Sequence, residues 1–181
     1  MDRFEIRLSG AGGQGVITTG IMLAEAALGQ GLNAVQTQAY GPEARGGASR
    51  AEVVISSAAI DYPKVERPDI VLALSQPAYD LYGRSAPEGA LVVYDSDLVT
   101  ADDSDGPATR RGLPLTALAR QATGRAVTAS TLAAAVVGSL SGVITRDALR
   151  QAVRGNVPKG TIDINLRALE EGFRAAEALG D

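Results

Sequence analysis

The sequence predicts an α/β fold, a three-layer sandwich in which helices flank a mostly parallel sheet, formed as a single domain by residues 1–181. Short apolar runs typical of strands alternate with longer stretches whose apolar residues recur at helical spacing. Two runs, residues 69–74 and 90–94, are almost continuously apolar, which is typical of parallel strands covered on both faces. A glycine-rich loop at residues 10–15 separates the first strand from the first helix, as in Rossmann-like folds.

The start of the chain predicts a βαβ unit within its first 38 residues. Residues 4–9 alternate apolar and polar side chains, as a strand with one buried face does. Residues 16–28 carry apolar residues at three- and four-residue steps, and Gly29 and Gly31 then favour a helix end. Residues 33–38 form the second predicted strand.

The rest of the chain begins with a polar, glycine-rich loop at residues 39–50 and a strand at 51–57. A short helix is predicted at 77–82, between the two apolar runs. The acidic stretch 95–112 is expected to be a surface loop with local disorder. Four further helices are expected: 115–121, 130–140, one that starts after the N-cap Thr145, and an amphipathic one over 162–179.

The composition excludes several classes of function within this chain. It has no cysteine, so it forms no disulfide and supplies no thiolate to zinc, to an iron–sulfur cluster or to nucleophilic catalysis. It has no histidine, which removes the usual general base near neutral pH and excludes Ser-His-Asp and Cys-His catalysis. The net charge of −4 argues against nucleic-acid binding, which requires a basic face.

No targeting or membrane-spanning segment is evident in the sequence. The first five residues, Met-Asp-Arg-Phe-Glu, lack the apolar core of a signal peptide. The longest stretch of small apolar residues, 127–144, is interrupted by serines and threonines and predicts a buried helix rather than a bilayer span. We therefore expect a cytoplasmic protein without a membrane partner.

The glycine loop is the first candidate for a binding site. Its glycines permit close backbone approach, and the following helix offers unpaired N–H groups, so a phosphate or pyrophosphate is the natural guest. Gly10, Gly12 and Gly15 match the spacing Gly-x-Gly-x-x-Gly. However, residues 33–38 end without the acidic residue that would bind the ribose of NAD, which disfavours NAD. The alternative is that these glycines only form a tight turn.

The second candidate is the loop at residues 40–50, in which Arg45 and Arg50 stand among glycines. Arginine can hold a phosphate or carboxylate through two parallel hydrogen bonds. Because this loop follows the second strand of the predicted parallel sheet, it should lie beside the glycine loop at the carboxyl ends of the strands. The alternative is a mobile surface loop with solvated charges.

Other candidates are weaker, and each has a plain structural alternative. Glu43 could act as a general base, although such loop glutamates are more often solvated or ion-paired. Lys64 could meet an anion, although most such lysines are ordinary surface residues. Ser75 and Gln76 either face the crevice at the sheet edge or cap the next helix. The acids around Asp102 are expected to be exposed, and the apolar stripe of the last helix to form core or subunit contact.

Both loops and their flanking segments resemble one protein family. The segments are Gly-Ala-Gly-Gly-Gln-Gly at residues 10–15, Gln-Ala-Tyr-Gly-Pro-Glu-Ala-Arg-Gly-Gly-Ala-Ser at 38–49, Asp-Tyr-Pro-Lys at 61–64 and Leu-Ala-Leu-Ser-Gln at 72–76. They are similar to the gamma subunits of 2-oxoacid:ferredoxin oxidoreductases, with the 2-oxoglutarate type as the nearest match. The resemblance covers nearly the whole chain, including the tail at 157–159 and 165–170. The long loop is its most specific part.

The resemblance implies a subunit of a complex that decarboxylates a 2-oxoacid, such as 2-oxoglutarate, and yields acyl-CoA, CO2 and reduced ferredoxin. It implies alpha and beta partner subunits, with delta as a further candidate, and ferredoxin as acceptor for the whole complex. Thiamine diphosphate, magnesium and iron–sulfur clusters are then expected on partner subunits, which fits the absence of cysteine and histidine here. This chain would contact coenzyme A, support assembly, carry no catalytic residue or metal, and be inactive alone.

Carried over residue by residue, the resemblance places the glycine loop against the phosphates of coenzyme A. The second loop would complete that site or meet a partner subunit. The expected binding residues are Gly10, Gly12, Gly13, Gln14, Gly15, Arg45, Gly46, Gly47 and Ser49. Two features depart from the family: Ser130 opens a helix where members often have asparagine, and we can match no counterpart to the acidic insertion at 102–105.

Three alternatives remain open at this point. The first is a gamma-type subunit for pyruvate, branched-chain 2-oxoacids or indolepyruvate. The second is a stand-alone regulator that binds a nucleotide or coenzyme A through the same glycine loop. The third is a small NAD-dependent dehydrogenase, which the missing ribose acid and the missing histidine make the least favoured.

Overall fold

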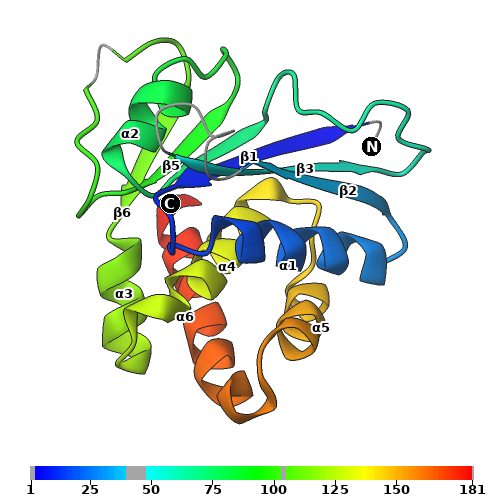
Figure 1. The fold of residues 1–181 in the computed structure, drawn as a ribbon, viewed down its shortest axis with the longest axis vertical. Coiled ribbons are helices and arrows are strands. Elements are labelled where there is room, and N and C mark those ends of the chain that lie inside the picture. Colours follow the sequence, from blue (N-terminus) through cyan, green and yellow to red (C-terminus); the bar gives the residue numbers. More distant parts are fainter. Residues whose placement is uncertain (1–2, 40–47, 103–104, 181) are drawn as a thin grey trace.

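The computed structural model describes residues 3–39, 48–102 and 105–180, and six strands of this part of the chain form one sheet (Figure 1). The strands lie in the order β2-β3-β1-β4-β5-β6. Their bounds are β1 Phe4–Gly10, β2 Asn33–Ala39, β3 Ser49–Ser56, β4 Ile70–Ala73, β5 Leu91–Asp95 and β6 Thr109–Leu113. Strands β1, β4, β5 and β6 are parallel, so the predicted α/β class with a mostly parallel sheet is confirmed.

Helices cover the two faces of the sheet unequally. The longer ones are α1 Val16–Gly29, α3 Leu115–Thr123, α4 Ala129–Ser141, α5 Arg146–Asn156 and α6 Ile162–Gly180, with the short turns η4 Ala126–Thr128 and η5 Lys159–Thr161 between them. The longer helices lie on one side of the sheet in Figure 1. On the other side lie α2 Gln76–Ala78 and its continuation η3 Tyr79–Gly83. The sandwich therefore has one thick and one thin helical layer.

Strand β3 runs against its neighbours and lies between the two strands of the predicted βαβ unit. It pairs antiparallel with β1 on one side and with β2 on the other, so β1 and β2 run in the same direction without pairing. Only residues 40–48 connect β2 to β3. A parallel return would need a crossover of about a dozen residues or more. The short connection therefore brings β3 back antiparallel, between β1 and β2.

The alternation of β4 shows how the sheet divides the core in two. Ile70 and Leu72 face the thick helical layer, whereas Val71 and Ala73 face α2 and η3. Both sets are buried, as expected for a strand covered on both faces.

Helix α4 lies at the centre of the larger core, where its residues 132–137 are fully buried. Helix α6 packs against it very closely, because a Cβ on Gly172 would lie 2.4 Å from the carbonyl oxygen of Leu132. Leu169 and Phe173 of α6 belong to the same core. The apolar stripe predicted on the last helix is therefore a core contact.

The stretch 95–112 differs from the surface loop that the sequence predicts. Its end, Thr109–Leu113, forms the edge strand β6, which pairs with β5. Asp95 is fully buried and accepts hydrogen bonds from the backbone N–H and the hydroxyl of Thr116, at the start of α3. Asp105 is also buried, whereas Asp102 is exposed as expected. A short edge strand with adjacent arginines lacks apolar alternation, so the pattern did not indicate it.

The other predicted helices and strands are confirmed within a few residues. Thr145 caps α5 by accepting a hydrogen bond from the N–H of Ala148. Ser75 caps α2 by accepting one from the N–H of Ala78, which is the structural alternative of the two that the sequence left open. Within the described residues, no helix is both long enough and apolar enough to cross a membrane.

Candidate functional site

The loop between β1 and α1 has a shape that requires glycine at both of its ends. Gly15 has a φ of +75°, and a Cβ there would lie 2.6 Å from the Cβ of Ser130 on α4. A Cβ on Gly10 would meet the Oε1 atom of Gln14 at 2.7 Å and the Cβ of Leu74 at 3.1 Å. These two glycines are therefore explained by packing and backbone conformation alone.

The side chain of Gln14 fastens this loop from inside. Its Oε1 atom accepts a hydrogen bond from the N–H of Ala11 at 2.6 Å, and its Nε2 atom donates to the carbonyl oxygen of Leu74 at 2.7 Å. Both ends of the amide are therefore engaged within the protein. The Gln14 side chain therefore holds the loop in one conformation.

The tip of the loop, by contrast, is open. Gly12 and Gly13 are exposed, and a Cβ on either would meet no described atom within 4 Å. Gly13 also has a φ of +87°, which a glycine adopts without strain. At least three clefts of the described structure have Gly13 in their walls. The tip is thus the place where bare backbone can meet a ligand.

The starts of α1 and α4 meet beside this tip. The hydroxyl of Thr19 lies 3.1 Å from the carbonyl oxygen of Gly15 and 3.0 Å from that of Ser130, so it links the two helices. Neither helix has a capping side chain in the described structure, and neither has an acidic residue in its first turn. The first-turn N–H groups and the positive dipole end of α1 therefore lie in this region, which favours an anion, whereas α4 continues from η4 and the N–H of Ala129 already donates to the carbonyl oxygen of Ala126.

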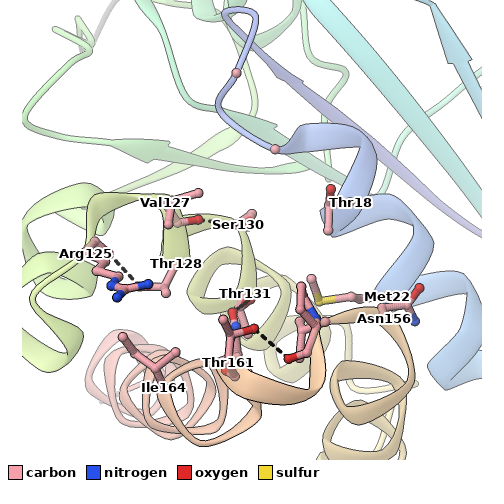
Figure 2. Close-up of a pocket in the computed structure, with 15 residues that line it drawn as sticks. Thr18, Met22, Arg125, Val127, Thr128, Ser130, Thr131, Asn156, Thr161 and Ile164 are labelled. Atoms are coloured by element: carbon pink, nitrogen blue, oxygen red, sulfur yellow. Dashed lines mark hydrogen bonds between the residues drawn. The ribbon is translucent and has the colours of Figure 1, made fainter.

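One of the clefts, with a volume of about 380 Å³, lies between the glycine loop, the starts of α1, α4 and α6, and the end of α5 (Figure 2). This size suits a small-molecule ligand. Its described wall combines neutral polar side chains, apolar side chains and one arginine. The residues of the wall include Thr18, Met22, Arg125, Ser130, Asn156 and Ile164.

The described end of the second predicted loop lies at the same edge of the sheet. Ser49 lies directly opposite Gly10 in the β1–β3 ladder and shares a cleft with Gly13. The end of β2 and the start of β3 lie at this edge because β1 and β2 run in the same direction, with β3 between them. Other predicted members of this loop lie outside the described residues: Arg45, Gly46, Gly47 and the weaker candidate Glu43.

Sequence reasoning missed the connection between α3 and α4, although it noted Ser130 at the start of α4 as a departure from the family. Arg125, Val127 and Ser130 line clefts that border the glycine loop, and Val127 is an apolar side chain with 73% of its surface exposed. The local signal was weak, because an exposed valine and a few hydroxyl residues before a helix are common. The hydrogen bond between Thr19 and Ser130 joins residues 111 apart, so only tertiary packing brings this connection to the loop.

The two remaining weak candidates lie away from the clefts at the glycine loop. The amide of Gln76 is hydrogen-bonded to Asp80 and to the backbone of Thr100. Lys64 is exposed, and its carbonyl oxygen accepts a hydrogen bond from Arg3. Neither side chain lines the described clefts that contain Gly13.

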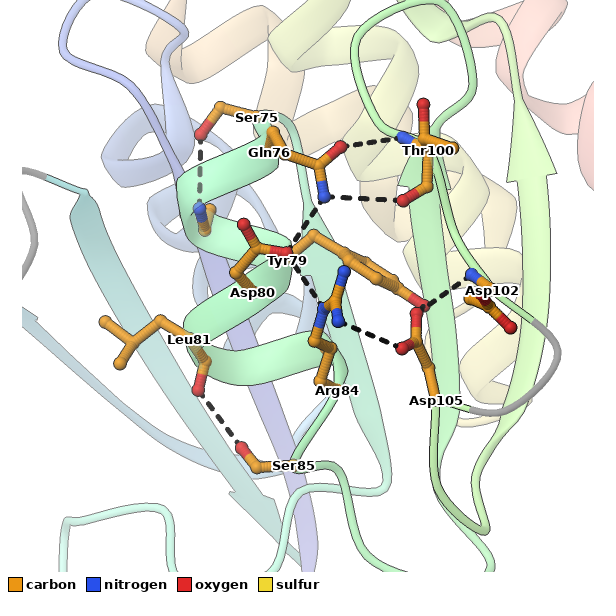
Figure 3. A network of polar contacts seen from close by, with 12 residues as sticks. Ser75, Gln76, Tyr79, Asp80, Leu81, Arg84, Ser85, Thr100, Asp102 and Asp105 are labelled. Carbon is orange, nitrogen blue, oxygen red and sulfur yellow. Dashed lines mark hydrogen bonds and ion pairs between the residues drawn. The ribbon is translucent and has the colours of Figure 1, made fainter.

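A second polar cluster lies on the thin side of the sheet, around η3 (Figure 3). The hydroxyl of the fully buried Tyr79 donates to Oδ2 of Asp105 at 2.9 Å and accepts from Nε of Arg110 at 2.9 Å. Arg84 forms an ion pair with Asp105 at 3.3 Å. These contacts fasten the segment around Asp105 to η3.

The two acidic groups of this cluster have shifted pKa values. The backbone N–H of Asp102, together with the Tyr79 hydroxyl and the nearby Arg84, lowers the pKa of Asp105. Burial and then the hydrogen bond to Asp105 raise the pKa of Tyr79. Asp105 therefore stays a carboxylate and Tyr79 a phenol across the neutral range, as a structural pair requires.

Comparison with known proteins decides the family. Residues 5–175 match the family described as pyruvate ferredoxin/flavodoxin oxidoreductase. The chain belongs to this family. It is 44% identical over 179 residues to 2-oxoglutarate synthase subunit KorC of Methanocaldococcus jannaschii, a match that covers 98% of this chain and 96% of the relative. The same subunit of Methanothermobacter marburgensis is 43% identical over 94% of this chain and 95% of its own length.

Solved structures of related proteins share the fold. The keto/oxoacid ferredoxin oxidoreductase gamma subunit of Geobacter sulfurreducens has a TM-score of 0.85 and 40% identity, over 97% of this chain and 99% of that one. The 2-oxoglutarate:ferredoxin oxidoreductase of Magnetococcus marinus was solved with 2-oxoglutarate, coenzyme A and succinyl-CoA bound. It has a TM-score of 0.86 at 22% identity, over 98% of this chain and 32% of its own, which shows a shared fold. The predicted resemblance to gamma subunits is therefore confirmed.

Proposed function

We propose that this chain is the gamma-type subunit of a 2-oxoglutarate:ferredoxin oxidoreductase and that it binds coenzyme A at the glycine loop. The observation that carries the proposal is the open tip at Gly12 and Gly13, in a chain 44% identical to a 2-oxoglutarate synthase subunit. Coenzyme A contains a diphosphate, which suits the bare backbone of the tip and the first-turn N–H groups of α1. It is also the co-substrate that the family resemblance implies.

Relatives named for other 2-oxoacids match this chain less well. Ketoisovalerate oxidoreductase subunit VorA of Methanothermobacter thermautotrophicus is 36% identical, and indolepyruvate oxidoreductase subunit IorB of Archaeoglobus fulgidus is 28% identical. These identities favour 2-oxoglutarate. A gamma-type subunit for pyruvate, branched-chain 2-oxoacids or indolepyruvate is the second candidate.

The residues of this chain fit a binding role rather than a chemical one. Without cysteine or histidine, it offers neither thiolate ligands for an iron–sulfur cluster nor an imidazole to move a proton. We therefore assign thiamine diphosphate, magnesium and the clusters to alpha, beta or delta partner subunits, where they would supply carbon–carbon cleavage and electron transfer to ferredoxin. A cytoplasmic location and a single domain over residues 1–181 belong to the same proposal.

Within this proposal, the parts of the glycine loop have separate tasks. The glycines at its two ends allow it to pack against β4 and α4, and Gln14 holds its conformation. The exposed pair at the tip brings bare backbone to the phosphates. Ser49 borders the same region from β3. The proposal also assigns three residues of the second loop to the site: Arg45, Gly46 and Gly47.

The test is a methyl group at the tip. The Gly12→Ala change places a Cβ in open space, so the protein should fold normally, whereas a phosphate lying against the backbone would be displaced. In the complex purified with its partner subunits, we expect the KM for coenzyme A to rise about tenfold, with the KM for 2-oxoglutarate unchanged. Gly29→Ala is the matched control, since its Cβ also meets no atom within 4 Å, at the far end of α1.

Two results would contradict the proposal. Oxidation of 2-oxoglutarate by the isolated chain would show that it needs no partner subunits. An unchanged KM for coenzyme A in the Gly12→Ala complex would place the coenzyme A site elsewhere. Calorimetry on the isolated chain checks the regulator alternative, which predicts tight binding of a nucleotide or coenzyme A without any partner.

A further inference from the structure

The cleft beside the glycine loop contains a positive charge that forms no ion pair with a described residue. Among the described residues that line it, Arg125 is the one with a charged side chain. The other polar groups of this wall are hydroxyls and amides. The cleft is therefore positive in character and continuous with the tip of the glycine loop, because Gly13 and Gly15 belong to the same wall.

The backbone of Arg125 is hydrogen-bonded, whereas its guanidinium has no ion-pair partner among the described residues. Its N–H donates to Oγ1 of Thr123 at 3.1 Å, and its carbonyl oxygen accepts from Oγ1 of Thr128 at 2.8 Å. The two threonine hydroxyls themselves lie 2.8 Å apart. No carboxylate of the described residues lies within ion-pair distance of the guanidinium. A fixed backbone with an unpaired charged group suits an arginine that binds a ligand.

The rest of the cleft has room and surfaces for a nucleoside. Figure 2 shows Arg125 at one end of the row of lining residues and Met22 and Asn156 at the other. The half-buried Ile164 offers apolar surface to a flat base, and the exposed Thr18 offers a hydroxyl, whereas Met22 is only 1% exposed and adds little surface. The volume of about 380 Å³ is within the range of pockets that hold small ligands.

We propose that Arg125 binds the 3′-phosphate of coenzyme A, with the adenosine end of the molecule in this cleft. The inference rests on the proposed function, which places the diphosphate at the tip of the glycine loop. A guanidinium binds a phosphate monoester through two parallel, charge-assisted hydrogen bonds. Since 3′-dephospho-CoA lacks this phosphate, Arg125 is the residue by which the chain distinguishes the two molecules.

The experiment compares coenzyme A with 3′-dephospho-CoA as co-substrates of the assembled complex. In the wild type, we expect a KM about tenfold lower for coenzyme A. In Arg125→Ala, the KM for coenzyme A should rise to the value that the wild type shows for 3′-dephospho-CoA. The KM for 3′-dephospho-CoA and the kcat should not change. In Arg125→Lys, part of the preference should remain, because the charge is kept and the paired hydrogen bonds are lost.

Arg120→Ala is the matched control, because Arg120 is an exposed arginine of α3 that does not line the cleft. This variant should keep the full preference for coenzyme A. Arg125 is exposed as well, so its truncation should leave the melting temperature of the protein unchanged.

The outcomes separate this inference from the proposed function. The role of Arg125 would be overturned if the wild type had equal KM values for coenzyme A and 3′-dephospho-CoA. It would also be overturned if Arg125→Ala kept the preference for coenzyme A, or if this variant raised both KM values equally. The proposed site at the glycine loop would then still stand if Gly12→Ala raises the KM values for both co-substrates. If Gly12→Ala changes neither KM, the site itself is wrong. We expect Arg125→Ala to lose the preference for coenzyme A, and Gly12→Ala to keep this preference while the KM values for both co-substrates rise equally.

Discussion

The glycine-loop region and the Tyr79 cluster both gather polar groups, but they use them in opposite ways. In the Tyr79 cluster, Asp105 is bound by Tyr79 and Arg84, and the hydroxyl of Tyr79 also accepts from Arg110. At the glycine loop, the exposed tip and the guanidinium of Arg125 lack such partners among the described residues. Polar groups that are paired internally stabilise a fold, whereas unpaired groups at an open cleft are available to a ligand.

The comparison also divides the glycine loop itself. Its two ends are packed against neighbouring elements, so substitutions there should act on stability. Its tip is open, so substitutions there should act on binding. The variants below test this division, from the largest expected effect to the smallest.

The largest effect is expected for Gly15→Ala. An alanine here would have a φ of +75°, which strains its backbone, and its Cβ would lie 2.6 Å from the Cβ of Ser130, which overpacks the contact. Both effects destabilise the folded state. We expect the free energy of unfolding, measured by urea titration, to fall by about 2–4 kcal/mol. Gly31→Ala is the control, because Gly31 has a φ of +85° with no atom within 4 Å of a Cβ, and should lose about 1 kcal/mol.

A double variant separates the two causes at this position. Adding Ser130→Gly removes the side chain that the new Cβ would meet, so part of the lost stability should return. If the two substitutions were simply additive, the contact between the starts of α1 and α4 would not be the reason for glycine at this position.

A smaller effect is expected for Tyr79→Phe in the paired cluster. The change removes a buried hydroxyl and leaves Asp105 and Arg110 short of a partner, so the free energy of unfolding should fall by about 1–3 kcal/mol. The KM for coenzyme A should not change, because the cluster lies on the thin side of the sheet. A raised KM at unchanged stability would erase the distinction between the two regions.

The smallest effect is expected in the pH dependence of stability. The pKa of Asp105 is lowered from its ordinary value of 3.8, so its carboxylate stabilises the folded state. This contribution is fully present above about pH 4 and is lost as the pH falls through the folded-state pKa. Urea unfolding from pH 7 to pH 2 should show Asp105→Asn less stable than wild type at pH 7, with the difference narrowing below pH 4. A difference that stays constant with pH would exclude this role of the carboxylate.

Most elements of the fold could be predicted from local pattern. The alternation in residues 4–9, the apolar run at 69–74 and the helical spacing at 162–179 each depend on a period that neighbouring residues carry themselves. The glycine loop was recognisable for the same reason, since its spacing and its place before a helix are local features. Resemblance to a family supplied the function that local pattern could not.

Orientation and burial were the parts that pattern could not predict. The antiparallel direction of β3 depends on the length of one connection and on which edge of β1 is free. The acids Asp95 and Asp105 occur in a stretch that looks like a solvated loop, yet both are buried against partners distant in sequence. Their burial became favourable only because those partners satisfy the carboxylates.

The sequence by itself determined the α/β class, the position of the glycine loop and the lack of thiolate and imidazole chemistry, because composition and short-range periodicity carry that information. The tertiary structure alone decided which glycines are packed and which are open. It also decided that the start of α4 meets the start of α1, and that Arg125 lines the cleft beside the glycine loop. Those outcomes depend on contacts between segments far apart in the chain, formed when the helices bury their apolar faces together against the sheet.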